Sequence, residues 1–197
     1  MNKKILISII LLSSLHWVSA QTKLFNGKNL SGWKVHGTEK WYVDNGELVC
    51  ESGPDKQYGY LASEKDFKDF ELKVDFKQES NGNSGVFFHS SIEGTKITGW
   101  QAEVAPKGKS TGGIYESYGR EWLIKPDPKL DSHLKEGDWN TLVVRVKGDV
   151  VDTFLNGVQM IHLKDDKIGN SKGKIALQIH DGGGVKVRWR KIEVQEL

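Results

Sequence analysis

The stretch DFELKVDFKQE, Asp69–Glu79, decides the fold class of this chain because apolar and charged residues alternate along it. Phenylalanine, leucine and valine fill every second position from Phe70 to Phe76, and the positions between them carry acidic or basic side chains. Successive side chains of a β-strand point to opposite faces. This period of two predicts a strand with one face in a core and the other in polar surroundings.

Shorter runs of the same kind lie on both sides of this stretch. Two of them enclose the Asp44-Asn45-Gly46 turn of WYVDNGELVCE, which is a strong hairpin signal. Further strands are expected at residues 84–90, 99–105, 111–117, 139–163 (three strands), 173–181 and 185–197. Residues 125–138, KPDPKLDSHLKEGD, predict a proline-interrupted loop with room for one short turn, and no helix of convincing length is expected. Ten or more short strands predict an all-β protein, a two-sheet antiparallel sandwich.

Residues 1–20 have the layout of a secretory signal peptide. Lys3 and Lys4 precede the apolar run Ile5–Leu15, and Val18-Ser19-Ala20 is typical of a small-residue cleavage site. An uncleaved membrane anchor is the alternative, but the apolar run is short for a hydrocarbon layer of about 30 Å. We therefore expect an exported protein, periplasmic or secreted, whose residues 21–197 form a single domain.

The charge and the cysteine content exclude several classes of function. Cleavage after Ala20 removes Lys3 and Lys4, so that 26 basic residues face 26 acidic ones. A neutral chain gives no electrostatic sign of a nucleic-acid partner, and no membrane insertion is expected after cleavage. Cys50 is the only cysteine, which excludes an intramolecular disulfide and a multi-cysteine zinc site.

Three of the expected strands place polar side chains on the face opposite to their apolar residues. These faces carry Gln101 and Glu103 in GWQAEV, Gln178 and His180 in GKIALQIHD, and His89, together with Gly85 and Phe87, in NSGVFFHS. With the rings of Trp100 and Tyr115 beside them, such faces are typical of a sugar site, because hydroxyls need fixed donors and acceptors and pyranose faces stack on rings. Any half-solvated sheet shows the same alternation, so a wet sheet face is the alternative.

Two other segments hold candidate binding residues. Residues 111–123 place Tyr115, Glu116 and Arg120 in glycine-rich surroundings, which is typical either of a binding loop or of an irregular edge. Asp181 opens the DGGG loop after His180, where the backbone can approach a ligand closely or simply turn. The sequence contains no nucleophile elbow, zincin pair, Walker loop or dinucleotide fingerprint after a strand.

The order of the segments from LFNGKNLSGWK through GNSGVFFHS, GWQAEVAP and TGGIYESYGREWL to GKIALQIHDGGGVKVRWRKIEV resembles the 3-keto-disaccharide hydrolase family. The resemblance covers roughly Lys23 to Leu197. It implies a concanavalin A-like, laminarinase-type jelly-roll sandwich in an exported protein. The chain departs from the family at His89, where many members carry Arg.

The resemblance also implies an activity. We expect an enzyme that cleaves the glycosidic bond of 3-keto glycosides or disaccharides by ketone-assisted β-elimination and addition of water. QAEVAPKG has one carboxylate, where glucanases of this architecture carry paired carboxylates, so a two-carboxylate mechanism is not expected.

The expected roles follow from what this elimination needs. His180 or Glu103 is the candidate base, Arg120 and Gln101 would stabilise the enolate oxygen, and Tyr115 or Trp100 would pack on the sugar ring. The candidates for further substrate contacts are His89, Glu116, Gln178 and Asp181. No cofactor is assigned. A divalent ion bound by His180, Glu103 and His89 is an open alternative for polarising the ketone. A non-catalytic carbohydrate-binding module is the alternative function, and a protein-adhesion domain is a weaker third.

Overall fold

The computed structural model describes residues 20–80 and 82–197. Apart from Ala20, the predicted signal peptide lies outside the described residues. No helix in the described part of the chain is long and apolar enough to cross a membrane.

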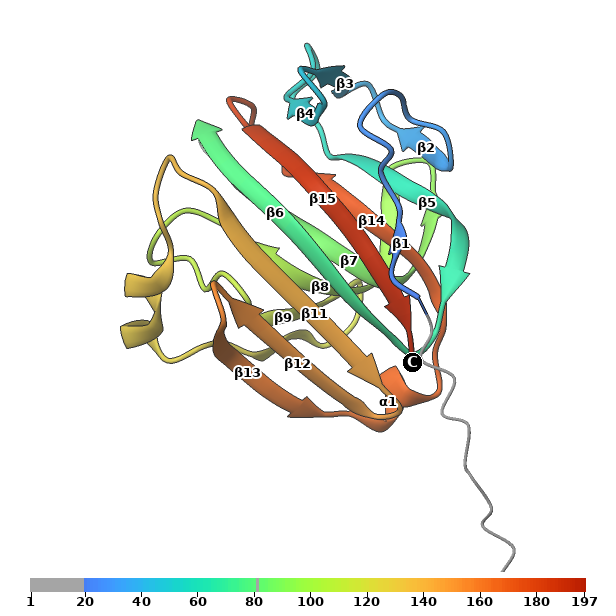
Figure 1. Ribbon diagram of the computed structural model, residues 1–197, viewed down its shortest axis with the longest axis vertical. Coiled ribbons are helices and arrows are strands. Elements are labelled where there is room, and N and C mark those ends of the chain that lie inside the picture. The colour runs from blue at the N-terminus through green and yellow to red at the C-terminus, as the bar shows by residue number, and fades with distance from the viewer. Residues whose placement is uncertain (1–19, 81) are drawn as a thin grey trace, which may run out of the picture.

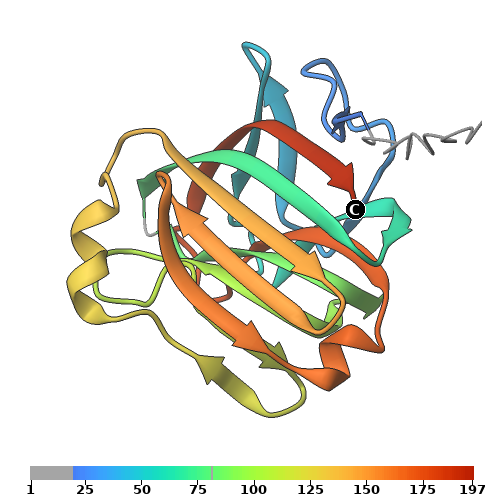
Figure 2. The same cartoon turned by 60° about the horizontal axis from the view of Figure 1, so that its bottom comes forward.

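The described residues form two antiparallel sheets that stack as two layers (Figures 1 and 2). The first sheet contains, in spatial order, β13 (Val158–Lys164), β12 (Val150–Leu155), β11 (Asn140–Lys147), β6 (Phe70–Ser80), β15 (Lys186–Glu196), β4 (Glu47–Glu51) and β3 (Lys40–Asp44), and β1 (Thr22–Lys23) pairs with β15. The second sheet contains β10 (Glu121–Ile124), β9 (Ile114–Ser117), β8 (Lys96–Val104), β7 (Ser84–Glu93), β14 (Gly173–Ile179), β5 (Gly59–Phe67) and β2 (Trp33–His36). The prediction of an all-β, two-sheet antiparallel sandwich is confirmed.

The stretch Asp69–Glu79 lies in β6, between β11 and β15 in the first sheet. Phe70, Leu72, Val74 and Phe76 are fully buried in the core between the sheets, as the alternation predicts. Asp75, on the opposite face, is buried as well. Thr141 donates to it and Arg190 and Lys191 form ion pairs with it, which offsets the cost of burying a carboxylate.

The connections match most of the predictions made from the sequence. The hairpin of β3 and β4 encloses the Asn45-Gly46 turn, and both turn residues have positive φ. A 3₁₀ helix, η1 (Pro128–His133), lies in the predicted proline-interrupted loop. A short helix that was not predicted, α1 (Asp166–Gly169), precedes β14.

The second sheet buries one face against the first sheet and leaves the other face outside the sandwich. Val86 and Phe88 of β7 and Leu177 of β14 belong to the core between the sheets. The alternate residues Phe87 and Ala176 form a separate apolar cluster with Tyr60, Ala62 and Ile97. The two clusters therefore lie on opposite faces of the second sheet, and the outer face is the one that carries polar side chains.

Candidate functional site

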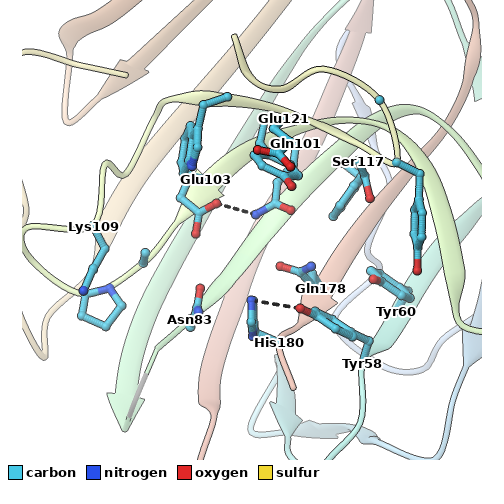
Figure 3. A pocket seen from close by; sticks show the side chains of 17 residues that line it. Tyr58, Tyr60, Asn83, Gln101, Glu103, Lys109, Ser117, Glu121, Gln178 and His180 are labelled. Atoms are coloured by element: carbon cyan, nitrogen blue, oxygen red, sulfur yellow. Dashed lines mark hydrogen bonds between the residues drawn. The ribbon is translucent and has the colours of Figure 1, made fainter. Parts of the chain in front are cut away.

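A pocket of about 690 Å³ lies on the outer face of the second sheet (Figure 3). This volume is in the range of pockets that bind small molecules. Strands β5, β7, β8 and β14 supply its floor, and segments around residues 58, 83, 105–109 and 117–122 form its walls.

The strand register brings the polar side chains of the floor together. Gln178 of β14 pairs with Tyr60 of β5 on one side and with Gly85 of β7 on the other, and Gly85 pairs with Glu103 of β8. Residues paired across neighbouring strands share a face. One row across the sheet thus runs from Tyr60 through Gln178 and Gly85 to Glu103.

A second row runs parallel to the first, two residues along each strand. It contains Ala176, Phe87, Gln101 and Tyr115 in register. Gln101 is therefore the neighbour of Glu103 on the same face of β8, as the sequence predicts.

Glu103 is the buried acid of this pocket, with 8% of its surface exposed. Nε2 of Gln101 donates a hydrogen bond of 2.6 Å to Oε2 of Glu103. Burial raises the pKa of Glu103 to about 8, although the hydrogen bond from Gln101 opposes that rise. The carboxyl group is therefore mostly protonated at neutral pH, when it can donate a proton.

Gly85 makes the contact between Gln101 and Glu103 sterically feasible. A Cβ atom at position 85 would lie 2.5 Å from Nε2 of Gln101 and 2.6 Å from its Cδ. The missing side chain leaves the space in which the amide reaches Glu103. The φ of Gly85 is not in the left-handed region, so its backbone conformation does not call for glycine. Glycine is required here because the side chain of Gln101 approaches the backbone closely.

His180 follows β14 and is held by partners on both ring nitrogens. Nδ1 lies 2.8 Å from Oδ1 of Asp181, and Nε2 lies 3.3 Å from the hydroxyl oxygen of Tyr58. A carboxylate at Nδ1 favours the tautomer with the proton on Nδ1, which leaves the lone pair on Nε2. Figure 3 shows His180 and Tyr58 on one side of the pocket and Glu103 with Gln101 on the other.

Two buried acceptors in the pocket make no hydrogen bond within the described residues. They are Oε1 of Gln178 and Oδ1 of Asn83. Buried polar atoms are normally paired, so both atoms favour a ligand or water that donates to them. Burial also raises the pKa of Tyr58 to about 12, so that its hydroxyl keeps its proton at neutral pH.

The structure brings together five of the candidate residues predicted from the sequence. Gln101, Glu103, Tyr115, Gln178 and His180 all line this pocket. A sixth candidate, Asp181, does not line it but contacts the imidazole of His180.

The predicted position of His89 is wrong. The alternation places it on the face of Gly85 and Phe87, but the register of β7 and β8 shifts between Phe88 and Ser91, and His89 has a positive φ of 46°. This irregularity turns the ring to the inner side, where it packs against Phe70 and Trp100. His89 borders a second, separate pocket.

Trp100, Glu116 and Arg120 also lie outside the main pocket. Trp100 and Glu116 point to the other side of their strands and border the second pocket. Arg120 binds Glu116 and forms two hydrogen bonds with Asp165, so its guanidinium is committed to a structural cluster. The expectation that Arg120 stabilises an enolate oxygen is therefore not met in this structure.

The donor set expected for a divalent ion is not assembled. No group of three or more His, Cys, Asp or Glu side chains within residues 20–80 and 82–197 is arranged to bind a metal ion. His180 and Glu103 line the main pocket, whereas His89 borders the other one. These three residues do not fit one ion.

Several residues of the pocket were not among the candidates predicted from the sequence. They are mainly polar or aromatic side chains of its floor and walls: Tyr58, Tyr60, Asn83, Lys109, Ser117, Tyr118, Glu121 and Trp122. For Tyr58 and Tyr60 a sequence signal did exist, because they alternate in phase with Ala62, whose side chain lies on the outer face of the second sheet. Ser117, Glu121 and Trp122 belong to strands β9 and β10 at one edge of the second sheet. Tyr58, Asn83, Lys109 and Tyr118 come from loops, whose approach to the sheet has no periodic signature.

Comparison with known proteins identifies relatives of this chain. The profile of the family described as 3-keto-alpha-glucoside-1,2-lyase-like domain matches residues 20–195. A 3-keto-disaccharide hydrolase of Bacteroides thetaiotaomicron is 31% identical over 74 residues, which cover 33% of this chain and 26% of that protein. The aligned part is thus about a quarter of the relative's length.

Solved structures show the same fold. A putative glycosyl hydrolase from Parabacteroides distasonis superposes with a TM-score of 0.66 at 24% identity, covering 90% of this chain and 94% of that one. The carbohydrate-binding module CBM66 from Bacillus subtilis superposes with a TM-score of 0.67 at 16% identity, covering 85% and 98%.

Proposed function

The chain belongs to the family of 3-keto-alpha-glucoside-1,2-lyase-like domains, and we propose that it cleaves the glycosidic bond of 3-keto glycosides by elimination and subsequent addition of water. The names of the family and of the Bacteroides relative support a carbohydrate-active, hydrolase-like activity. The 3-keto substrate and the mechanism are our proposal.

The proposed reaction needs one base and one acid. A ketone at C3 of the sugar acidifies the proton on C2, because the electron pair left behind delocalises into the carbonyl as an enolate. When the pair forms a double bond between C1 and C2, the bond from C1 to the glycosidic oxygen breaks, and that oxygen takes up a proton. Water then adds its oxygen to C1 and a proton to C2, which restores the 3-keto sugar and completes a net hydrolysis.

One observation carries the assignment of roles: the buried carboxyl of Glu103 lies across the pocket from an imidazole that a carboxylate holds in place. His180 is the proposed base, since Asp181 at Nδ1 leaves the lone pair on Nε2, which faces the pocket. In this structure the Tyr58 hydroxyl, 3.3 Å away, donates to that lone pair and must turn aside before Nε2 takes a proton from the sugar. Glu103 is the proposed acid, since its raised pKa of about 8 keeps it protonated at neutral pH. Two titratable groups in such different surroundings can take the separate roles of general acid and general base.

The rest of the pocket favours a ligand rich in hydroxyl groups. The unpaired acceptors of Gln178 and Asn83 would each accept a hydrogen bond from a sugar hydroxyl. Tyr60, Tyr115 and Trp122 provide aromatic surface on the same walls.

The route is tested by running the reaction in D₂O with a 3-keto glucoside. Elimination followed by addition places one deuterium on C2 of the product, whereas direct displacement at C1 places none. The isolated 3-keto product, incubated without enzyme for the same time, corrects for spontaneous exchange.

Variants test the two roles. We expect His180→Ala and Glu103→Gln each to lower kcat by roughly 10²- to 10⁴-fold, the range of a lost general acid or base. His162→Ala is the matched control, because His162 also pairs with a carboxylate, Oδ1 of Asp152 at 2.7 Å, but lies on β13 of the other sheet. Full turnover by both pocket variants would overturn the proposal.

A carbohydrate-binding module without catalysis is the alternative function. The same pocket would serve it, and the module CBM66 shares the fold. This alternative predicts saturable binding of unoxidised glycans and no cleavage of the keto sugar. We also propose that residues 1–20 direct export to the periplasm or the exterior, which N-terminal sequencing of the mature protein from its host would test.

A further inference from the structure

The proposed elimination creates a negative charge on one oxygen of the substrate. When His180 takes the proton from C2, the electron pair of the broken C–H bond delocalises to the ketone oxygen on C3, which becomes an enolate oxygen. Enzymes lower such barriers with cations or hydrogen-bond donors placed where the charge develops. The proposed function assigns a base and an acid, but no group to this oxygen.

Neither of the two stabilisers expected from the sequence is free to reach the enolate oxygen. The guanidinium of Arg120 is ion-paired outside the pocket. Nε2 of Gln101 donates to Oε2 of Glu103 at 2.6 Å and to the carbonyl oxygen of Ser84 at 3.4 Å, so both of its N–H groups are in use. The expectation that Gln101 stabilises the enolate oxygen is therefore not met in this structure.

Lys109 is the only lysine or arginine among the described residues that line the main pocket. Its ammonium group has no hydrogen bond or ion pair within residues 20–80 and 82–197. The cation is therefore free to pair with a charge that arises on a bound substrate. Unpaired lysines are ordinary on protein surfaces, so the position of this one decides its meaning.

The position of Lys109 suits the second of the two oxygens that the elimination involves. C1 and C3 both flank C2, so a sugar whose C2 faces His180 carries the leaving oxygen and the ketone oxygen on either side of that carbon. Figure 3 shows Lys109 on the side of the pocket that holds Glu103, with Asn83 between Lys109 and His180 in this view. Glu103 can then serve the leaving oxygen while Lys109 serves the ketone oxygen.

The acid and the cation do not disturb each other. Burial and the hydrogen bond from Gln101 set the pKa of Glu103, with no contribution from Lys109. An ammonium group in contact with Glu103 would lower that pKa and remove the proton that the acid needs. The two groups are therefore separate enough to act on different oxygens.

The neutral hydroxyl donors of the pocket are less suited to a full negative charge. The hydroxyl of Tyr58 lies 3.3 Å from Nε2 of His180, the base itself. Burial and then the negative charge of Glu121 raise the pKa of Tyr115, so a carboxylate lies close to that hydroxyl. A carboxylate repels an enolate, whereas the ammonium group of Lys109 attracts it.

The loop that carries Lys109 is fixed to the rest of the sandwich. The buried Thr111 closes this loop, since its Oγ1 donates to the carbonyl oxygen of Ala105 at 2.8 Å and accepts from the N–H of Ala105 at 3.0 Å. The N–H of Gly108 donates to Oδ2 of Asp131 in η1. The backbone of Lys109 is therefore held beside the pocket, and only its side chain has to move toward a substrate.

We propose that Lys109 is a further catalytic residue, whose ammonium group binds the C3 oxygen and stabilises the enolate that forms there. This inference rests on the proposed function, because the enolate arises only from a 3-keto sugar. Lys109 stays protonated throughout. It donates a hydrogen bond to the oxygen, while the C2 proton moves to Nε2 of His180 and returns to C2 when the double bond takes up water.

Deuterium exchange tests the enolate step apart from cleavage. The 3-keto derivative of 1,5-anhydroglucitol has no leaving group on C1, so in D₂O the enzyme can only remove and replace its C2 proton, which NMR follows. A sample without enzyme corrects for spontaneous exchange. We expect Lys109→Met to slow the exchange by roughly 10²-fold, the size of a lost oxyanion donor, and to lower kcat for a 3-keto glucoside by a similar factor. Lys109→Arg keeps the charge and should retain at least about a tenth of both rates.

Two further variants are the controls. Lys107→Met removes the same charge from the same loop, but Lys107 does not line the pocket, so both rates should stay within about threefold. Glu103→Gln should lower cleavage far more than exchange, because the acid acts on the leaving oxygen and the exchange probe has none.

The outcomes separate this inference from the proposed function. If Lys109→Met exchanges and cleaves like Lys107→Met, Lys109 is not catalytic, and the proposed function stands on the turnover of the unmodified protein. If Lys109→Met loses cleavage but keeps exchange, the residue acts on the leaving group and the enolate role is refuted. If the unmodified protein neither exchanges nor cleaves the 3-keto sugars, the proposed function fails and this inference fails with it.

Discussion

The ionisation of Glu103 should cost stability, and Glu103→Gln should remove that cost. The pKa of an exposed glutamate is 4.5, whereas burial raises that of Glu103 to about 8. A carboxyl whose pKa is raised in the folded state binds its proton more tightly there than in the unfolded chain. Its contribution to stability is therefore full below pH 4.5 and is lost as the pH rises toward 8.

The size of the loss follows from the two pKa values. With about 1.4 kcal/mol for each pKa unit, the ionisation of Glu103 lowers the free energy of unfolding by about 3 kcal/mol between pH 5 and pH 8. Glu103→Gln keeps the size of the side chain and cannot ionise. The free energy of unfolding of the variant, relative to the unmodified protein, should therefore rise by about 3 kcal/mol over this interval.

Urea denaturation of both proteins at several pH values from 5 to 8 measures this difference, and all other titrating groups cancel in it. The matched control is Glu116→Gln. Glu116 is also buried, but hydrogen bonds from Lys167 and Arg120 outweigh its burial and hold its pKa below the usual value. Its removal should not make the protein relatively more stable as the pH rises. A stability difference for Glu103→Gln that stays constant from pH 5 to pH 8 would refute a buried, protonated Glu103.

Four further predictions follow from the pocket and its surroundings. Activity should fall as the pH rises through about 8, where Glu103 loses its proton. A pH–rate profile of Gln101→Leu should show that fall at higher pH, because the hydrogen bond from Gln101 lowers the pKa of Glu103 and its loss raises that pKa. Gly85→Ala should displace Gln101 and lower kcat/KM by up to about 10²-fold while the protein still folds, as circular dichroism and steady-state kinetics can show. Tyr58→Phe, which removes the hydroxyl near Nε2 of the imidazole, should change kcat by about tenfold or less, and a larger loss would mean that the tyrosine itself transfers a proton. Arg120→Ala should lower stability by about 1 to 2 kcal/mol with kcat/KM within about threefold, because its guanidinium binds other side chains rather than the pocket.

Alternation along the strands made the fold and the floor of the pocket predictable. A period of two fixes which side chains share a face, so Gln101 with Glu103 and Gln178 with His180 were placed correctly. The hairpin of β3 and β4 was equally readable, because an Asn-Gly turn requires two residues with positive φ.

The failures lie where local geometry or distant partners override the alternation. His89 leaves its expected face because of an irregularity in β7, which no composition signal marks. Arg120 is held by Asp165, a residue 45 positions away, so its availability for a substrate depends on tertiary structure. The wall residues Tyr58 and Asn83 reach the pocket from loops for the same reason.

The most direct test of the central claim is cleavage of a 3-keto glucoside compared with the parent glucoside by the purified mature protein. The account predicts cleavage of the keto sugar alone, with one deuterium at C2 of the product in D₂O and a loss of roughly 10²-fold or more in His180→Ala. Cleavage of the unoxidised glucoside at a similar rate, or binding of glycans without cleavage of either compound, would contradict it.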